Sequence, residues 1–378
     1  MKVAVLFGPL CLSFRKSFDF DHLWTDPRGL TGSELGFVRI AQELRDMGHE
    51  VCLHTEAKQK EWDGMSILPL LGSHQCNDWA DVAVAINEPD LLRSFPGSIR
   101  VWECWLNDVT FCQPGFEQFV HLGISPSPAH LDQMLHNTAW HDVHVTPATP
   151  RGTHVYDPMK FDWKMIELGC DPQRYPAVDK IPGRVVYCSS PDRGLHWLLQ
   201  EWPKIRRAVP HATLHIFYRL RDWIAGFEGV NYFPPIEALR ARALYVAEAI
   251  RRMPDMGITV RDSVSRETIE REMAQAEVLA YPCDTTSWSE GFSCTILEAC
   301  AAQACPVITD CDALPSIYKG HTLMAERGKW SEWRELVIKA LKEPELRKEW
   351  NIKARRRAEE LTWKRHAEKL MEAVQTRL

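Results

Sequence analysis

The chain has 378 residues, of which 45% are hydrophobic and 25% charged, a composition typical of a globular protein large enough for two domains. Its formal net charge of −6 at pH 7 lacks the basic excess of a nucleic-acid-binding protein. No run of about 18 apolar residues occurs, so we expect no transmembrane helix. The 12 cysteines form no Cys-x-x-Cys pair, which favours free buried thiols in a reducing cytoplasm.

The first 55 residues alternate between strand and helix patterns. Residues 2–7 are mostly apolar and predict a strand. Residues 33–47 carry apolar side chains at helical spacing, and Gly48 is a suitable end for that helix. A second strand is expected at residues 50–55, which completes a βαβ unit and opens a parallel sheet. Further strands that continue this pattern are expected at residues 81–86, 99–102 and 121–125.

Proline and glycine recur between residues 146 and 183 and predict a connector. A second alternating series follows it. Its strands are expected at residues 184–188, 212–218, 258–260 and 278–281, and its helices at residues 194–209, 235–253 and 266–276. The charged stretch 343–378 predicts a pair of surface helices.

This pattern indicates two doubly wound α/β domains. The N-terminal domain is expected at residues 1–170, a connector at residues 171–183, and the C-terminal domain at residues 184–355. Residues 356–378 are expected to form a C-terminal helix, for which packing back toward the N-terminal domain is one option.

Residues 289–300 carry two carboxylates eight positions apart. Glu290 precedes a glycine in a predicted loop, and Glu298 lies in a helix expected at residues 295–304, before a strand at residues 306–309. The start of such a helix offers backbone N–H groups to phosphate oxygens. Glu290 could then face a sugar, and Glu298 could accept hydrogen bonds from ribose. The spacing alone also fits two solvated charges.

Two earlier turns are further candidates for a phosphate site. Gly32 and Ser33 lead into the first helix, where glycine permits close approach to an anion and Ser33 would serve equally well as an N-cap. Arg193 follows the strand at residues 184–188 and suits bidentate phosphate contact, although Asp192 could instead cap the helix and leave Arg193 in solvent. Neither a Gly-x-Gly-x-x-Gly turn after the first strand nor a P-loop is present.

In this order, the features resemble those of family 4 (group 1) retaining glycosyltransferases of the GT-B fold. The matching segments are residues 31–34, 192–194 and the Glu290-x7-Glu298 run, supported by residues 45–51 and 169–175. The resemblance spans the chain from the first strand to about residue 317. It implies an α/β protein with two Rossmann-like, doubly wound domains and an interdomain cleft. The acceptor side would be the domain at residues 1–170, and the nucleotide-sugar-binding domain would be residues 184–355.

The resemblance also implies a function. A sugar would pass from a nucleoside diphosphate sugar to an acceptor hydroxyl with retention of anomeric configuration, without a metal or other cofactor. Glu290 would be the catalytic residue and would orient the donor sugar. The expected donor-binding residues are Gly32, Ser33, Ser190, Arg193, Gly291, Phe292, Ser293, Cys294, Thr295 and Glu298.

The chain departs from the family pattern in places. Residues 102–108 lack the histidine that the family often places against the donor sugar, Arg193 is the one clear basic residue for the diphosphate, and Ser316 replaces a later glutamate. These departures keep open a catalytically weak sugar-nucleotide-binding protein, or a sugar-nucleotide epimerase on the same fold. Acceptors consistent with the resemblance are a saccharide, a lipid-linked saccharide, a protein, a small metabolite or, less favoured, modified DNA. The expected location is cytoplasmic, with peripheral attachment at the inner membrane face as an alternative.

Overall fold

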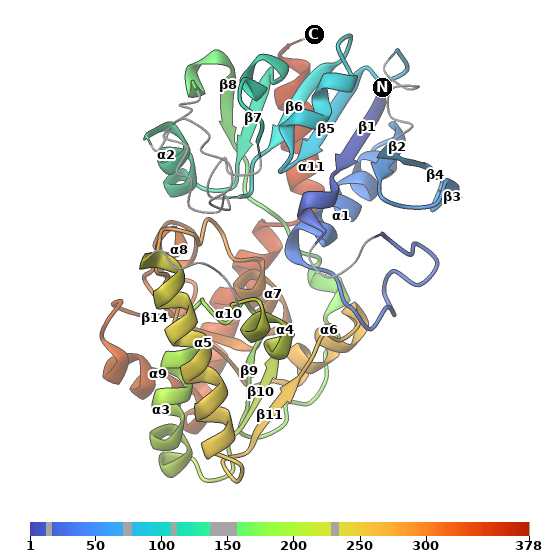
Figure 1. Ribbon diagram of the computed structural model, residues 1–378. Helices are drawn as coiled ribbons and strands as arrows, with labels where there is room; N and C mark the ends of the chain where they lie inside the picture. The colour runs from blue at the N-terminus through green and yellow to red at the C-terminus, as the bar shows by residue number, and fades with distance from the viewer. Residues whose placement is uncertain (13–16, 71–77, 107–111, 137–156, 228–233, 378) are drawn as a thin grey trace. The chain divides into compact units, whose positions relative to one another are not determined.

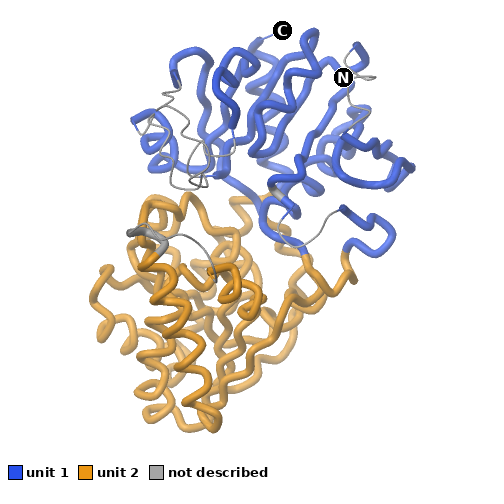
Figure 2. Tube along the Cα trace, viewed as in Figure 1, with its two compact units in different colours: residues 1–23, 30–169, 363–378 blue, residues 24–29, 170–362 orange. Residues whose placement is uncertain are grey.

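The computed structural model describes all residues except 13–16, 71–77, 107–111, 137–156, 228–233 and 378. The chain forms two compact units, shown in Figures 1 and 2. Unit 1 comprises Met1–Leu23, Leu30–Gly169 and Trp363–Leu378, and unit 2 comprises Trp24–Gly29 and Cys170–Thr362. Residues 171–183, expected to be a connector, therefore lie within unit 2, and so do residues 356–362.

Within the described residues, unit 1 contains an eight-stranded sheet of order β3-β4-β2-β1-β5-β6-β7-β8. Neighbouring strands are parallel except for the β3–β4 pair. The predicted strands at residues 2–7, 50–55, 81–86, 99–102 and 121–125 are confirmed. The strands are β1 (Lys2–Phe7), β2 (Glu50–Thr55), β3 (Lys60–Trp62), β4 (Met65–Pro69), β5 (Val82–Ile86), β6 (Ile99–Glu103), β7 (Leu122–Ser125) and β8 (Asp162–Met165).

Three of these strands were not expected. β3 and β4 form a short antiparallel pair at one edge of the sheet, and β8 forms the other edge, within the stretch where the breakers predicted a connector. No residue of β3 or β8 is fully buried. Edge strands of this kind lack the continuous apolar run that marks a buried parallel strand in a sequence.

Helix α1 (Gly32–Asp46) begins with a capping box. The Thr31 hydroxyl accepts a hydrogen bond from the N–H of Glu34 at 3.3 Å, and the Glu34 carboxylate accepts one from the N–H of Thr31 at 2.8 Å. The N-cap is therefore Thr31 and not Ser33. The other unit 1 α-helices that the structure describes are α2 (Pro128–His136) and α11 (Trp363–Gln375).

Helix α11 packs on α1 within unit 1, which confirms the option that the C-terminal helix packs toward the N-terminal domain. The expectation that it is a surface helix was wrong. Its residues Trp363, His366 and Leu370 are buried. Gly36 of α1 makes the contact possible, since a Cβ atom there would lie 2.7 Å from the Trp105 ring and 2.8 Å from the Trp363 ring. The apolar stripe of α11 faces the core rather than solvent.

His366 also anchors α11 through a buried ion pair. Its Nε2 lies 3.1 Å from Glu103 Oε1 at the end of β6, and its Nδ1 lies 2.9 Å from the Glu167 carbonyl oxygen. The side chains of His366 and Glu103 are both 0% exposed. Burial opposes the charge on His366, but Glu103 outweighs this effect and the pKa of His366 is raised. A carbonyl oxygen and a carboxylate oxygen both accept hydrogen bonds, so these two contacts favour the ring form that donates through both nitrogens.

The described part of unit 2 contains a six-stranded, fully parallel sheet of order β11-β10-β9-β12-β13-β14. The chain moves outward from β9 to β11 and then returns to place β12 on the other side of β9. This reversal is the topological switch point, where open α/β sheets bind ligands. The strands are β9 (Arg184–Tyr187), β10 (Thr213–Phe217), β11 (Ile258–Arg261), β12 (Val278–Tyr281), β13 (Cys305–Thr309) and β14 (Leu323–Ala325).

The helices of unit 2 include those predicted near residues 194–209, 235–253, 266–276 and 295–304, which are confirmed within a few residues. None of the helices in the described ranges combines the length and apolarity needed to cross a membrane. The α-helices are α3 (Leu195–Ala208), α4 (Leu220–Ala225), α5 (Pro234–Arg252), α6 (Arg266–Gln275), α7 (Cys294–Ala302), α8 (Leu314–Tyr318), α9 (Trp330–Lys342) and α10 (Pro344–Glu360).

The His366–Glu103 pair generates a stability prediction. His366→Ala leaves Glu103 buried without its cation, so the free energy of unfolding should fall by about 3–5 kcal/mol. Because the folded-state pKa of His366 is raised, the pair's contribution is complete below the ordinary histidine pKa of about 6.5. It is lost as the pH rises through the raised value. Denaturant unfolding of wild type and variant at several pH values measures both effects.

His136→Ala is the matched control, since the His136 side chain of α2 is 75% exposed. It should leave the free energy of unfolding within about 0.5 kcal/mol of wild type. Equal stability of the two variants would contradict the structural role of the buried pair.

Candidate functional site

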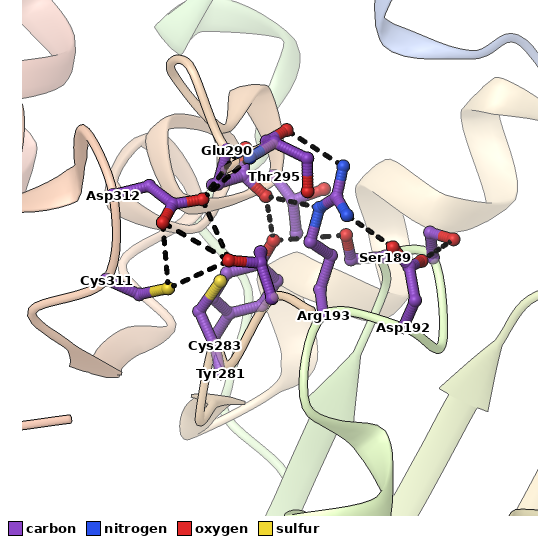
Figure 3. A network of polar contacts seen from close by, with 12 residues as sticks. Ser189, Asp192, Arg193, Tyr281, Cys283, Glu290, Thr295, Cys311 and Asp312 are labelled. Carbon is purple, nitrogen blue, oxygen red and sulfur yellow. Dashed lines mark hydrogen bonds and ion pairs between the residues drawn. The ribbon is translucent and has the colours of Figure 1, made fainter. Parts of the chain in front are cut away.

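The switch point of unit 2 brings together two loops that carry predicted site residues. Residues 188–194 link β9 to α3, and residues 282–293 link β12 to α7. Because β9 and β12 are parallel neighbours, both loops leave the same edge of the sheet. Figure 3 shows the polar network that joins them.

Gly194 allows the two loops to touch. Its φ of +95° lies in the left-handed region, and a Cβ atom at this position would lie 1.8 Å from the Pro282 carbonyl oxygen. Glycine meets both requirements without steric cost. The close approach places Arg193, the residue before Gly194, against the loop that carries Glu290.

Arg193 bonds to acceptors in both loops (Figure 3). Its Nε donates to Glu290 Oε2 at 3.1 Å, and another guanidinium nitrogen donates to the Ser289 carbonyl oxygen at 2.9 Å. The third nitrogen is ion-paired with Asp192. Burial opposes the charge, but Asp192 and Glu290 outweigh burial and raise the pKa of Arg193. The guanidinium is therefore a fixed positive charge at the switch point.

Glu290 is 8% exposed. The Tyr281 hydroxyl donates to its Oε2 at 2.6 Å, on the same oxygen that Arg193 contacts. Burial raises the pKa of Glu290, while Arg193 and the Tyr281 hydrogen bond act in the opposite direction. Its ionised form thus depends on these two partners.

Asp312 fixes the backbone at Glu290. Its Oδ2 accepts hydrogen bonds from the N–H groups of Ser289 and Glu290, both at 2.9 Å, and from the Thr285 hydroxyl at 3.0 Å. Asp312 itself has a φ of +50°, a conformation that aspartate tolerates better than most residues. Sequence reasoning missed Asp312, and the signal available was an acidic residue shortly after the strand β13.

The first turn of α7 has no side-chain cap from its N-cap residue. The N-cap residue Ser293 has a φ of +69° and forms no capping hydrogen bond through its side chain. The Tyr318 hydroxyl donates to the Ser293 carbonyl oxygen at 2.8 Å and holds this conformation. The first N–H groups of a helix have no acceptor within it and carry partial positive charge, which suits an anion.

The remaining loop residues take different positions. Phe292 is 3% exposed and packs against Tyr318, with ring centroids 6.2 Å apart. The Thr295 hydroxyl donates to the Cys188 carbonyl oxygen at 2.9 Å.

Burial raises the pKa of the Cys294 thiol, which is therefore neutral at physiological pH. The Ser190 hydroxyl bonds to Asp192. These side chains make contacts within the protein. The residues that carry them would therefore contact a ligand through their backbone groups.

Glu298 lies in α7, and its side chain is 10% exposed. Its Oε1 is 2.7 Å from Arg266 of α6, which also donates to Glu270 at 2.8 Å and to the Tyr175 hydroxyl at 2.6 Å. Burial raises the pKa of Glu298, and Arg266 opposes this rise. Arg266 is a partner that sequence reasoning did not identify. Nothing in a single sequence marks which arginine of α6 turns inward.

Gly32 and Ser33 belong to unit 1, where they open α1 at the switch point between β1 and β5. The Ser33 hydroxyl accepts a hydrogen bond from the Asn87 side chain at 3.3 Å. Asn87 follows β5 with a φ of +63°. Gly32 and Ser33 thus lie at the switch point of the unit 1 sheet, where open α/β sheets bind ligands. The remaining predicted site residues lie in unit 2.

Residues 102–108, which lack the histidine that the family often places against the donor sugar, include Glu103. Glu103 is fully buried and pairs with His366. Asn107 and Asp108 of that segment lie outside the described residues. In the parts of the chain that are described, no three His, Cys, Asp or Glu side chains are grouped so as to hold a metal ion.

The Arg266 cluster generates a prediction. Arg266→Met leaves Glu298 buried without its cation, whereas Glu270 keeps its ion pair with Arg174 at 2.7 Å. The free energy of unfolding should therefore fall by about 3–5 kcal/mol at neutral pH. The loss should shrink at acidic pH, where Glu298 takes up a proton. Arg271→Met, at an exposed position of the same helix, is the control in denaturant unfolding. An Arg266 variant as stable as the Arg271 variant would contradict the assignment.

Comparison with known proteins gives a family match for part of the chain and a fold for its whole length. Residues 182–343 match the family described as Glycosyl transferases group 1, and no curated protein sequence matches the chain. A glycosyltransferase involved in Avilamycin A biosynthesis is similar in structure, with 17% identity, a TM-score of 0.60 and coverage of 98% of this chain and 96% of that one.

Two other solved structures are similar over almost their whole length. A glycosyltransferase involved in lipopolysaccharide biosynthesis has 14% identity, a TM-score of 0.60 and coverage of 98% of both chains. A trehalose-6-phosphate synthase has 9% identity, a TM-score of 0.68 and coverage of 99% of both chains. The family match is thus limited to residues 182–343, and the chain as a whole has the GT-B fold expected from its sequence.

Proposed function

We propose that the protein is a retaining glycosyltransferase that moves a sugar from a nucleoside diphosphate sugar to an acceptor hydroxyl without a metal ion. The family match and the fold support glycosyl transfer as the class of reaction. The observation that carries the proposal further is the network of Arg193, Glu290 and Tyr281 at the unit 2 switch point, beside the uncapped start of α7.

The difficulty of the reaction lies in charge separation. As the bond between the sugar and the diphosphate breaks, the diphosphate gains negative charge and the sugar becomes oxocarbenium-like. Arg193 and the first N–H groups of α7 are fixed positive groups that would stabilise the departing diphosphate. Such groups need no reorganisation during the reaction, which is why they favour the transition state over the bound substrate.

The two glutamates would have separate roles. Glu290 would accept hydrogen bonds from the donor sugar and balance the positive charge that develops at its anomeric carbon. Glu298, in the second turn of α7, would accept hydrogen bonds from the ribose hydroxyls. Arg266 would keep Glu298 ionised for this purpose, since an ionised carboxylate is an acceptor only. Gly32 and Ser33, at the switch point of unit 1, remain proposed donor-binding residues through their backbone N–H groups.

A second candidate is a catalytically weak sugar-nucleotide-binding protein. Its support is that the guanidinium of Arg193 is already engaged by Glu290, Asp192 and the Ser289 carbonyl oxygen. A diphosphate would have to compete with these acceptors. Release of nucleoside diphosphate from a panel of uridine, guanosine and adenosine diphosphate sugars, with and without acceptors, distinguishes the two. Binding without any release would favour the second candidate.

Glu290→Gln tests the catalytic assignment. The amide retains the size of the side chain but removes its charge, so turnover should fall about a hundredfold while the thermal unfolding midpoint stays near that of wild type. Glu267→Gln, at an exposed position of α6, should retain wild-type turnover. Anomeric configuration of the product, measured by proton NMR, tests retention.

Glu298→Ala tests the nucleotide assignment. Loss of the carboxylate should weaken binding of the nucleoside diphosphate about tenfold or more, measured by calorimetry, with a smaller effect on turnover at saturating donor. Full transferase activity in both the Glu290 and the Glu298 variants would show that the site is wrong.

A further inference from the structure

The Tyr281 hydroxyl lies between Ser189 and Glu290, at the centre of the network in Figure 3. Tyr281 is the last residue of β12, and its side chain is fully buried. Its ring is stacked on that of Tyr187, the last residue of β9, with centroids 6.0 Å apart and an interplanar angle of 20°. The position of the hydroxyl is therefore set by the core of the sheet.

The direction of the hydrogen bonds follows from the chemistry of the groups. An ionised carboxylate is an acceptor only, so the Tyr281 O–H donates to Glu290 Oε2 at 2.6 Å. The Tyr281 oxygen can then accept from the Ser189 hydroxyl, which lies 3.2 Å away. The short distance to Glu290 is typical of a charge-assisted hydrogen bond.

Both partners of the Glu290 carboxylate meet the same oxygen. Arg193 Nε lies 3.1 Å from Oε2, and the Tyr281 hydroxyl lies 2.6 Å from it. Across the described ranges, no group donates a hydrogen bond to Oε1 of Glu290. One oxygen is thus held from two directions, and the other remains for a ligand.

We propose that Tyr281 is a positioning residue for the proposed transfer: with Arg193 it holds Glu290 by Oε2 and presents Oε1 to a hydroxyl of the donor sugar. This inference rests on the proposed function. Tyr281 reaches the substrate only through Glu290, whose orientation and negative charge it maintains. Sequence reasoning assigned no role to Tyr281.

The charged groups that face Glu290 decide the effect of losing this hydroxyl. They are Arg193 and Asp192 from the turn after β9, and Asp312 from the loop after β13. Burial and the two aspartates favour the protonated form of Glu290, and Arg193 and Tyr281 favour the ionised form. Removing the hydroxyl therefore raises the pKa of Glu290 further, and a protonated Glu290 would donate through one oxygen instead of accepting.

Tyr281→Phe is the test, because it removes one oxygen atom and keeps the stacked ring. The turnover number should fall about tenfold with a smaller change in KM, and the acidic limb of its pH profile should move to higher pH. Tyr187→Phe is the control. It removes an equally buried hydroxyl, which donates to the Ser190 carbonyl oxygen at 2.7 Å and reaches no carboxylate. Its acidic limb should stay at the wild-type position.

A second measurement does not require activity. Carbon-13 NMR of protein labelled at the glutamate carboxyl carbons, with the Glu290 signal assigned by its loss in Glu290→Gln, follows ionisation directly. The titration midpoint should be higher in Tyr281→Phe than in wild type and unchanged in Tyr187→Phe. An unshifted midpoint and an unshifted acidic limb in Tyr281→Phe would overturn the inference.

The Glu290→Gln variant separates this inference from the proposed function. If Glu290→Gln loses activity while Tyr281→Phe matches wild type in turnover and pH profile, the role of Tyr281 is wrong and the catalytic site stands. If Glu290→Gln retains full activity, the proposed catalytic site is wrong, and with it the role of Tyr281 in transfer.

Discussion

A buried carboxylate must be compensated, and this constraint organises the ligand-binding edge of unit 2. Glu290 is 8% exposed, so its charge depends on Tyr281 at the end of β12 and on Arg193 in the loop that follows the neighbouring strand β9. Asp312, in the loop after β13, fixes the backbone on which Glu290 sits. The parallel sheet brings these groups together because all its strands end at one edge. A site built in this way is held by the core and not by loops alone.

The sequence predicted the central elements of both sheets, because buried parallel strands and the helices between them have strong periodic signals. β1, β2 and β12 were expected at the residues where they occur. The edge strands β3 and β8 were not, since their side chains alternate little and are seldom buried. The packing of α11 toward the N-terminal domain was one of the expected options, and its apolar stripe is buried. Its particular partner, α1, lies more than 300 positions away in the chain, and no local pattern indicates that pairing.

The candidate site shows the same division. Arg193 was expected to contact the diphosphate and Glu290 the sugar of the donor, and the structure places Arg193 Nε 3.1 Å from Glu290 Oε2. Tyr281, Asp312 and Arg266 were not identified, although each bonds directly to a predicted residue or to its backbone. Tyrosine at the end of a strand is ordinarily a core residue, and an arginine in a helix is ordinarily solvated. Their roles arise from long-range contacts, which require coordinates.

Crystal structures of the protein grown separately with uridine, guanosine and adenosine diphosphates would locate the bound nucleotide. We expect the diphosphate oxygens of the nucleotide that binds to lie within hydrogen-bond distance of the Arg193 guanidinium and of the first N–H groups of α7. The ribose hydroxyls should face Glu298. A nucleotide bound away from Arg193 and α7 would contradict the account, and so would a diphosphate held at that edge by other groups.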